Sequence, residues 1–541
     1  RQIMGLFLNT LSPAMLYEEI AGSTYFVDKT EFIGRVAERI GTSAKYLCLT
    51  RPRRFGKTVM ANMLGAFFTK AGDSRKIFTS LKISGNKQVM QQMNQYNVIY
   101  IDFSRVGGDS SSYTSYIENI TAILKNDLHK AYPQVDYRVG GSASEDLERI
   151  TAATGERFIF IFDEWDAIFH ASFITEEDRK SYLLFLRDLL KDRAYVYLAY
   201  MTGVLPISKY TSGSELNTFA EYNMATMVMY SDVFGFTDSE VDALFAKYLQ
   251  NTSRPRVTRE GLRVWYDGYH SAAGELMYNP RSVVLALQNN QLYNYWTSSG
   301  PYDEIFYYIK NNVQAVRDDL ALMAAGERIS VRIQEYAAML LELNTKQQIF
   351  SAMVVYGLLT YENGQVFIPN KELMDKFNEL LLTKASLGYV HQLALKSEQM
   401  LQATLHGDTE TMSSILAFAH HTETPLLVYN NETELSAIVN LVYLAARDRY
   451  YVQREDRAGL GYVDFIFYPY NQHDDCLILE LKVDHTPEEA IAQIKEKQYA
   501  LKFAGTLGDA HKRYDGRILA VGIGYNKKDK QHSCKVEVLQ A

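Results

Sequence analysis

The sequence has 541 residues, of which 47% are hydrophobic and 22% are charged, and its formal net charge is −8. This length exceeds what one hydrophobic core supports, so we expect several structural units. The acidic balance excludes a protein that coats nucleic acid with its whole surface, although it is compatible with a local basic groove.

The three cysteines, Cys48, Cys476 and Cys534, lie far apart and show no Cys-x-x-Cys spacing. This pattern argues against a disulfide framework or a zinc site and favours a reducing cytoplasm. No apolar run approaches the roughly 18 residues that a membrane-spanning helix needs. The N-terminal IMGLFL stretch is too short for a signal peptide and has no basic leader. We therefore expect a cytoplasmic protein without a membrane partner.

In chain order, the first third alternates short apolar runs with segments of helical periodicity. Strands are expected at residues 45–50, 97–103, 157–164 and 195–203, and apolar residues recur at helical spacing from Lys57 to Phe68. Strands separated by helices predict a parallel sheet with helices on both faces, which is a three-layer α/β domain.

From about residue 236 the pattern is mostly helical, with an exception at 351–370. That stretch predicts a helix and then a hairpin, with strands at Leu358–Tyr361 and Gln365–Ile368 around an Asn363-Gly364 turn. A helix followed by such a hairpin suggests a winged helix. Because 351–370 contains no Lys or Arg, we interpret it as a packing module rather than a DNA-binding one. Strands are expected again near 462–468, 475–483 and 517–524.

Residues 51–58 read RPRRFGKT, between an expected strand and an expected helix. The end of this stretch matches a phosphate-binding loop, whereas Arg51 occupies the position of the usual first glycine. Such a loop needs a glycine for close backbone approach, a lysine for the β- and γ-phosphates and a hydroxyl for Mg²⁺. We assign these three roles to Gly56, Lys57 and Thr58.

An acidic pair, Asp163 and Glu164, ends the third expected strand. In P-loop ATPases a carboxylate at this place supports Mg²⁺, and a glutamate directly after it is suited to deprotonating the attacking water. Thr202, at the end of the next strand, is either a polar sensor near the γ-phosphate or an ordinary strand-end threonine. The alternative for the whole set is a capped helix N-terminus beside a solvated basic loop.

The expected ligands are therefore ATP and Mg²⁺. The expected nucleotide contacts are Arg54, Phe55, Gly56, Lys57, Thr58, Asp163 and Thr202. We also expect at least one of Arg51, Arg53 and Arg54 to face the phosphates or a neighbouring subunit. No arginine finger can be selected, since Arg187 and Arg193 are candidates by position only.

Six motifs occur in a fixed order: YFVDKTEFI (25–33), RPRRFGKT, FDEWD (162–166), TGVLPISK (202–209), WYDGY (265–269) and YNPRSV (278–283). The set resembles the bacterial AAA-ATPase-like family whose members often carry a PD-(D/E)XK nuclease-like C-terminus. The resemblance spans nearly the whole chain and implies that RPRRFGK is the normal form of this loop. We expect WYDGY and YNP to hold the helical region together rather than to do chemistry.

A second constellation lies near the C-terminus. Glu480 and Lys482 are two residues apart on an expected strand, so they share one face, and Asp464 lies on a preceding strand. Asp464 and Glu480 would hold Mg²⁺ or Mn²⁺, which prefer oxygen ligands, and Lys482 would help to activate water. Taken alone, this pattern is better interpreted as an exposed strand face; the resemblance to PD-(D/E)XK nucleases favours the metal site.

The resemblance also implies a further acidic metal ligand, Glu434, although Asn431-x-x-Glu434 equally resembles a helix capping box. Gln493 and Tyr499 follow in the order that these folds use. Tyr462 is a departure, because it stands where the family often has an arginine before the first carboxylate. That departure puts efficient cleavage in doubt.

The sequence thus predicts an α/β protein of four units: a three-layer P-loop ATPase domain (1–235), a helical lid and winged-helix-like region (236–372), a helical connector (373–425) and a restriction-endonuclease-like domain (426–541). One hypothesis is an enzyme in which ATP hydrolysis, driven by Glu164, gates a metal-dependent nuclease acting on nucleic acid, with DNA favoured over RNA. The other is a nucleotide-controlled switch or scaffold whose C-terminal domain binds without cleaving. A homo-oligomer is left open.

Overall fold

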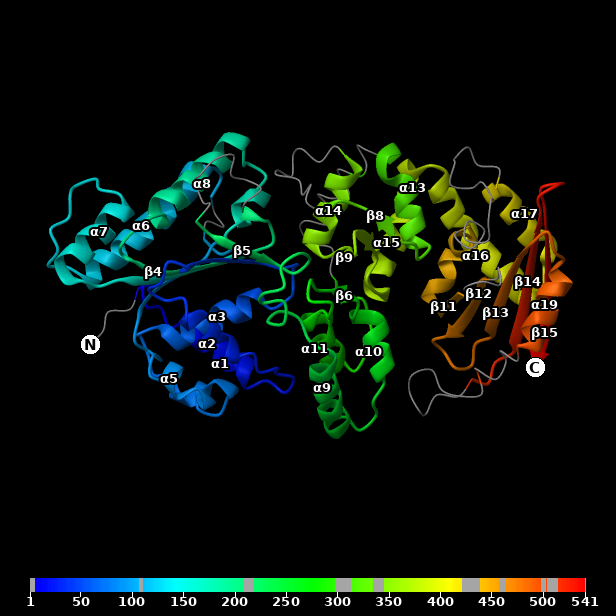
Figure 1. Cartoon of the computed structure of the whole chain (residues 1–541), viewed down its shortest axis with the longest axis horizontal. Helices are drawn as coiled ribbons and strands as arrows, with labels where there is room; N and C mark the ends of the chain where they lie inside the picture. Colours follow the sequence, from blue (N-terminus) through cyan, green and yellow to red (C-terminus); the bar gives the residue numbers. More distant parts are fainter. Residues whose placement is uncertain are drawn as a thin grey trace.

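The computed structural model describes residues 5–106, 110–207, 218–296, 309, 313–333, 345–420, 438–456, 463–497, 503 and 514–540. The elements follow one long axis, with the first sheet at one end of the molecule and the last sheet at the other (Figure 1). Within the described part of the chain, no helix is both long enough and apolar enough to cross a membrane.

The first sheet consists of five parallel strands in the order β2-β3-β4-β1-β5. Its strands are β1 (Tyr46–Thr50), β2 (Asn97–Asp102), β3 (Phe158–Asp163), β4 (Val196–Gly203) and β5 (Ala220–Asn223). The four expected strands are confirmed, and β5 is an edge strand that the sequence pattern did not reveal. Because β4 lies between β1 and β3, the carboxyl ends of these three strands are neighbours.

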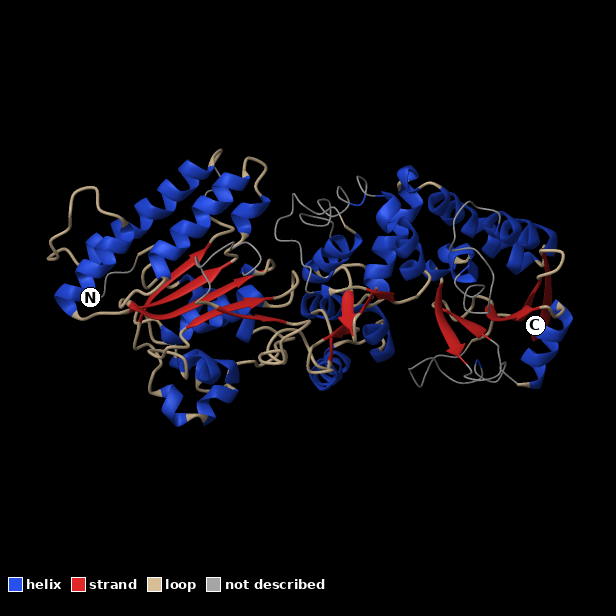
Figure 2. Ribbon diagram, turned by 45° about the horizontal axis from the view of Figure 1, so that its top comes forward, coloured by secondary structure: helices blue, strands red, loops and turns tan. Residues whose placement is uncertain are grey.

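Helices cover both faces of this sheet, which confirms the three-layer expectation (Figures 1 and 2). One face packs on α6 (Tyr113–Ala131), α7 (Ala143–Thr154) and α8 (Glu176–Leu190). The other packs on α1 (Ser12–Ala21), α2 (Glu31–Ala37) and α3 (Lys57–Phe68), with the short α4 (Arg75–Phe78), η1 (Lys82–Gly85) and α5 (Lys87–Met90) beside them. Alternation along β1 sends Cys48 to the first core and Leu47 and Leu49 to the second, as period-two geometry requires.

The middle region begins with α9 (Asp238–Asn251), α10 (Arg259–Tyr266), the hairpin β6 (Tyr269–His270) and β7 (Leu276–Met277), and α11 (Pro280–Asn289). It continues with α13 (Val313–Ala324), β8 (Ile329–Ser330), α14 (Lys346–Tyr356), β9 (Thr360–Glu362) and β10 (Gln365–Phe367). The last three strands form an antiparallel sheet in the order β8-β10-β9. The expected hairpin is confirmed, and Asn363 and Gly364 at its turn both have positive φ.

The C-terminal part has a five-stranded mixed sheet in sequence order. Its elements are α15 (Lys371–Thr383), η6 (Ala385–Leu387), α16 (Tyr389–His406), α17 (Thr409–His420), η8 (Leu444–Asp448), β11 (Tyr450–Asp456), β12 (Val463–Pro469), β13 (Cys476–Val483), α19 (Pro487–Glu496), β14 (Ile518–Asn526) and β15 (Gln531–Gln540). Helices α16 and α17 cover one face of this sheet and α19 covers the other. The central strand β13 is therefore covered on both sides.

Candidate active site

The phosphate-binding loop joins β1 to α3, and its last glycine is the N-cap of that helix. Gly56 has a φ of 88°, a left-handed conformation that favours glycine. Lys57, the first residue of α3, is buried, and its Nζ donates hydrogen bonds to the carbonyl oxygens of Arg51 (3.1 Å) and Pro52 (2.7 Å). Burial lowers the pKa of this lysine. The loop therefore wraps around its own ammonium group at a helix N-terminus, the arrangement that receives a phosphate.

Two hydroxyl groups converge on Asp163, which is fully buried at the end of β3. The Oγ1 of Thr58 donates to one carboxylate oxygen at 2.8 Å, and the Oγ1 of Thr202 donates to the other at 2.7 Å. Burial nonetheless raises the pKa of this carboxyl. Three of the expected contacts, from α3, β3 and β4, thus meet at one point, and their oxygen atoms are the donors that Mg²⁺ prefers.

Glu164 follows directly and has a φ of 55°, unusual for a residue with a long side chain. Burial raises its pKa to about 7, against the opposing charge of Lys57. A strained backbone and a buried carboxyl that titrates near neutrality are typical of catalytic positions. Glu164 is therefore a candidate general base.

Asp166 holds this turn in place, a role that the sequence analysis missed. Its Oδ2 accepts hydrogen bonds from the backbone N–H groups of Val204 (3.0 Å) and Leu205 (2.8 Å), which follow β4. A Cβ at Gly203 would lie 2.5 Å from the Trp165 ring, so only glycine permits this approach. The signal was present in the sequence, because Asp166 belongs to the FDEWD motif.

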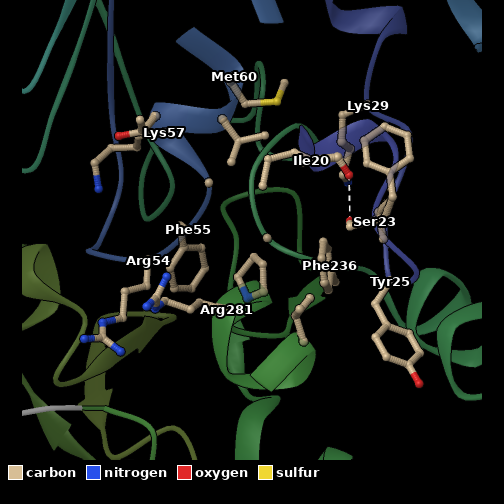
Figure 3. A pocket seen from close by; sticks show the side chains of 18 of the residues that line it. Ile20, Ser23, Tyr25, Lys29, Arg54, Phe55, Lys57, Met60, Phe236 and Arg281 are labelled. Atoms are coloured by element: carbon tan, nitrogen blue, oxygen red, sulfur yellow. Dashed lines mark hydrogen bonds between the residues drawn. The ribbon is translucent and has the colours of Figure 1, made fainter. Parts of the chain in front are cut away.

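A cavity of about 730 Å³ lies in front of the loop. Its walls include Tyr25, Phe26, Arg54, Lys57, Phe236 and Arg281. Figure 3 shows Arg281, from α11, beside Arg54 and Phe55 of the loop. Burial and then the like charge of Arg281 lower the pKa of Arg54, as expected where cations surround a place for an anion. Aromatic walls and a cationic floor suit a nucleoside triphosphate.

The second constellation lies on the α19 side of the C-terminal sheet. In the β12–β13 register Asp464 is directly opposite Glu480, and Lys482 is two residues further along β13. Glu480 and Lys482 are 0% and 5% exposed. The interpretation of these two residues as an exposed strand face is therefore wrong, because β13 is central and covered. Lys497, which the sequence analysis did not select, places its Nζ 3.5 Å from a Glu480 oxygen.

The donor set at this second site is described only in part. Glu434, Tyr462 and Tyr499 lie outside the described residues, as does the side chain of Asp464. Gln493 lies on α19. Nowhere in the described residues do three or more His, Cys, Asp or Glu side chains gather as a metal site would require. The described carboxylate, Glu480, has a lysine as its neighbour.

Comparison with known proteins identifies a family for each of the two domains that carry these constellations. Residues 15–211 match a family model described as a predicted AAA-ATPase, and residues 431–526 match one described as the PD-(D/E)XK nuclease superfamily. The chain carries an AAA-ATPase-like domain and a PD-(D/E)XK nuclease-like domain. This outcome confirms the resemblance inferred from the motifs, and it agrees with the parallel sheet of the first domain and the mixed sheet of the last.

A curated relative is the uncharacterized protein in the vnfD 5′ region of Azotobacter chroococcum mcd 1, which is 31% identical over 283 residues. The match covers 51% of this chain and 51% of that protein, so the chain spans about half the length of the relative.

Similar solved structures include a Walker-type ATPase of Pyrococcus abyssi, with 9% identity and a TM-score of 0.35, covering 64% of this chain and 94% of that one. Another is the Aeropyrum pernix ORC2 protein in ADPNP–ADP complexes, with 10% identity and a TM-score of 0.28, covering 71% and 97%. TM-scores this low do not establish a shared arrangement of whole chains.

Arg51 of the AAA-ATPase-like domain faces away from the cavity. Its guanidinium is buried and donates to the carbonyl oxygens of Thr50 (2.7 Å), Tyr222 (2.7 Å) and Tyr230 (2.8 Å). It also lies 4.8 Å from the centre of the Phe234 ring. The residue that replaces the first glycine therefore braces β1 against β5 and the segment after it. Of the three loop arginines, Arg53 and Arg54 are the ones that line the cavity.

The remaining loop residues contact the middle region. Phe55 is 1% exposed and packs edge-to-face on Tyr269 of the WYDGY motif, with ring centres 4.9 Å apart. Gly357, which directly follows α14, packs closely on Pro52 of the loop, because a Cβ added at Gly357 would lie 2.6 Å from the Pro52 side chain. Phe55 is thus beside the cavity but mainly serves this packing. The expected structural role of WYDGY extends to holding the phosphate loop itself.

Other residues near the site were not predicted. Asp102, opposite Asp163 in the β2–β3 register, accepts hydrogen bonds from the backbone N–H and hydroxyl of Ser104, which lines the cavity. Its position at the carboxyl end of a neighbouring strand was the available signal. Arg187 and Arg193 pair with Asp188 and Glu148. Both arginines precede β4 in the chain and so lie near its amino-terminal end, whereas the phosphate loop lies at the carboxyl ends of the strands.

Proposed function

We propose that the chain binds and hydrolyses ATP at the P-loop and couples this cycle to a nuclease-like domain that acts on nucleic acid. The observation that carries the proposal is the convergence of Lys57, Thr58, Asp163, Glu164 and Thr202 beside a cationic cavity of about 730 Å³. A basic surface loop with a chance GKT would not place two hydroxyls on a buried carboxylate of another strand.

In this proposal the loop backbone and Lys57 hold the β- and γ-phosphates, while Thr58 and Asp163 would hold Mg²⁺. Bound Mg²⁺ would neutralise charge on the phosphate oxygens. Thr202 orients Asp163 through its hydrogen bond, and Glu164 accepts a proton from the attacking water. Arg281 approaches the phosphates from α11, a lid element outside the parallel sheet, so its contact depends on the position of that lid.

The test of the ATPase compares the native chain with Lys57→Ala and Glu164→Gln. We expect nucleotide binding to be lost in the first variant, and hydrolysis but not binding to be lost in the second. Nucleotide binding that is undetectable in the native chain, or unchanged in Lys57→Ala, contradicts the assignment of the site.

For the middle region we infer a winged helix that serves as a packing module, within the boundaries 236–372. The sheet order β8-β10-β9 with α14 before the hairpin supports that fold. The packing role is supported by Tyr269, whose hydroxyl donates to the Gly357 carbonyl at 3.1 Å, and by the backbone N–H of His270, which donates to Thr360 at 2.8 Å. These contacts join β6 to β9 and to the end of α14 within the middle region, and this region meets the phosphate loop at Phe55 and Pro52.

Nucleic acid as the partner of the last domain is supported by the turn between β14 and β15. Lys527, Lys528 and Lys530 are exposed there, next to Asp484, which directly follows β13 and accepts a hydrogen bond from the Lys527 N–H. Three cations therefore project at the end of the strand that carries Lys482. Phosphate contacts of this kind give a steep salt dependence.

The test of nucleic-acid binding uses fluorescence anisotropy in EDTA, with DNA and RNA duplexes compared. Replacing Lys527, Lys528 and Lys530 by Gln should weaken binding and make its salt dependence shallower. Replacing the exposed Lys82, Lys87 and Lys247 by Gln removes the same charge elsewhere and should have little effect. Equal effects of the two triple variants would contradict a role for the turn.

The contact between Lys497 and Glu480 favours a second candidate function, a nucleotide-controlled switch whose last domain binds without cleaving. An ammonium group lies 3.5 Å from the candidate metal ligand and competes with a metal ion for that carboxylate. Cleavage assays with Mg²⁺ and Mn²⁺ on the native chain and Lys482→Ala separate the two functions. Metal-dependent cleavage that Lys482→Ala abolishes supports the nuclease, and its absence supports the switch.

A further inference from the structure

A buried glutamate outside the P-loop connects two of the cavity arginines, Arg54 and Arg281. Glu372 lies in the first turn of α15 and is 0% exposed. One of its oxygens accepts a hydrogen bond from the Tyr295 N–H at 2.8 Å, and the Ser282 hydroxyl lies 2.9 Å from both oxygens. Its own backbone carbonyl accepts from the Asn294 side chain at 3.1 Å. A single carboxyl thus ties α15 to two earlier segments, one at Ser282 and one at Tyr295.

The first of these connections leads to the phosphate loop. The carbonyl oxygen of Tyr295, whose N–H is held by Glu372, accepts a hydrogen bond of 2.6 Å from Nη1 of Arg54. Arg54 has a φ of 68°, so the loop is in an unusual conformation at this residue. The Arg54 guanidinium, which lines the cavity, is therefore linked to the carboxyl of Glu372 through the backbone of one residue, Tyr295.

The second connection leads to the lid. Ser282 is the neighbour of Arg281 on α11, and both residues lie in the first turn of that helix. The hydrogen bond from Ser282 to Glu372 ties this turn to α15, and thereby sets how far Arg281 extends toward the cavity. One buried group thus contacts the segments that carry two neighbouring cavity arginines, Arg54 and Arg281.

Helix α15 also contacts the last domain. The Nζ of Lys371, the residue before Glu372, donates to the carbonyl oxygen of Arg447 at 2.7 Å, and Arg447 belongs to η8. Lys371 lies 4.9 Å from the centre of the Tyr470 ring, directly after β12. A displacement of the first turn of α15 would therefore move contacts with the nuclease-like domain.

We propose that Glu372 is a positioning residue of the nucleotide site, which holds Arg54 through Tyr295 and Arg281 through Ser282 and links their positions to α15. This inference rests on the proposed binding of ATP at the P-loop. Because binding linkage is reciprocal, nucleotide occupancy must then also affect the first turn of α15.

Affinity for nucleotide distinguishes this role from general support of the fold. Glu372→Gln keeps the size of the side chain and removes its charge. We expect it to weaken binding of a non-hydrolysable ATP analogue by about fivefold or more, and binding of ADP by much less. The reason is that the additional phosphate of the analogue carries the negative charge that Arg54 and Arg281 attract. Equal losses for both nucleotides would overturn the proposal.

Asp375→Asn is the matched control, because it makes the same change one turn further along α15, where Asp375 pairs with Lys371 at 3.0 Å. We expect it to leave both affinities unchanged. If Asp375→Asn and Glu372→Gln shift the ratio of ATP-analogue to ADP affinity equally, α15 acts only as a scaffold and the proposal fails.

The reciprocal test follows hydrogen exchange in the full chain. In the native chain the ATP analogue should change exchange in segment 291–296 and in the first turn of α15, and Glu372→Gln at saturating analogue should lose that change. Unchanged exchange in a native chain that binds the analogue overturns this inference and leaves the proposed function intact. No binding by the native chain, or binding that Lys57→Ala does not reduce, overturns the proposed function.

Discussion

At the scale of single residues, burial raises the pKa of two glutamates to about 7, but their surroundings differ. Glu164 has a strained backbone, lines the cavity and is influenced by the charge of Lys57, so its carboxyl is placed to accept a proton from a bound water. Glu372 is surrounded by donors, and its pKa is raised by burial although Ser282 and the Tyr295 backbone oppose the rise. The first arrangement suits proton transfer, and the second suits holding neighbouring segments in place.

Replacing Glu164 by Gln should lower ATP turnover by about 10²- to 10⁴-fold, the usual contribution of a general base, while nucleotide affinity is retained. Since the base must be deprotonated, native turnover should rise with pH through about 7, and the residual turnover of the variant should not. Measuring phosphate release over about pH 5.5 to 8.5 checks both points. A variant with the native pH profile would contradict the role of Glu164.

Replacing Glu372 by Gln should change how stability depends on pH. The folded-state pKa of about 7 is above the ordinary 4.5, so the folded chain holds this proton more tightly. The contribution of Glu372 to the free energy of unfolding is present below pH 4.5 and is lost as pH rises through 7. Between pH 4.5 and 7, the free energy of unfolding of the variant should therefore rise by on the order of 3 kcal/mol relative to that of the native chain. Urea unfolding at several pH values checks this, and a constant difference would contradict it.

At the scale of elements, the sequence predicted the buried strands well and the edges poorly. The strands β1 to β4 and β12 to β14 are recognisable because buried strands carry apolar runs, and this includes β2, which is buried although it lies at the edge of its sheet. The strands β5, β11 and β15 were missed; all three lie at sheet edges, and polar residues interrupt them, as in QHSCKVEVLQ.

For the candidate site, the residues next to the ends of β1, β3 and β4 were predictable because strand order brings those ends together. Arg281, Tyr25 and Glu372 were not, since their places depend on tertiary contacts between segments up to hundreds of residues apart. Periodicity carries no information about such contacts. The buried direction of Arg51 was also not predictable, because charge alone suggested that it faces the phosphates.

The turn in WYDGY gives a prediction about an element. Gly268 has a φ of 97°, and a Cβ there would lie 2.0 Å from the Pro369 carbonyl oxygen, just before α15. Gly268→Ala should therefore lower the free energy of unfolding by at least about 2 kcal/mol. Gly274→Ala, with a φ of 83° and no neighbour within 4 Å, separates backbone strain from the clash. Similar losses in both variants, measured by thermal unfolding, would contradict close packing at Gly268.

At the scale of the whole molecule, the nucleotide cavity is built from the N-terminal segment, the phosphate loop and the lid helix α11. A ligand bound there contacts segments that otherwise touch only in part. Its binding energy therefore adds to the stability of the ATPase-like domain and of the lid together.

Saturating ATP analogue should consequently raise the temperature at which both regions unfold, by an amount that corresponds to about 2.7 kcal/mol at one hundred times the dissociation constant. Thermal unfolding followed by proteolysis at sites in each region measures the effect. Lys57→Ala should abolish it. Stabilisation confined to the ATPase-like domain would show that the lid does not close on the nucleotide.

The packing of Phe55 on Tyr269 also bears on how such a protein can be cut or recombined. A fragment that stops at residue 235 would leave that aromatic ring, now 1% exposed, open to water at the mouth of its own nucleotide site. We therefore expect the ATPase-like domain to need the middle region when it is moved into another protein. The eight residues of the phosphate loop (51–58) thus have two tasks, because they form the candidate nucleotide site and also contact the neighbouring middle region. A different neighbouring domain would therefore require substitutions in the phosphate loop.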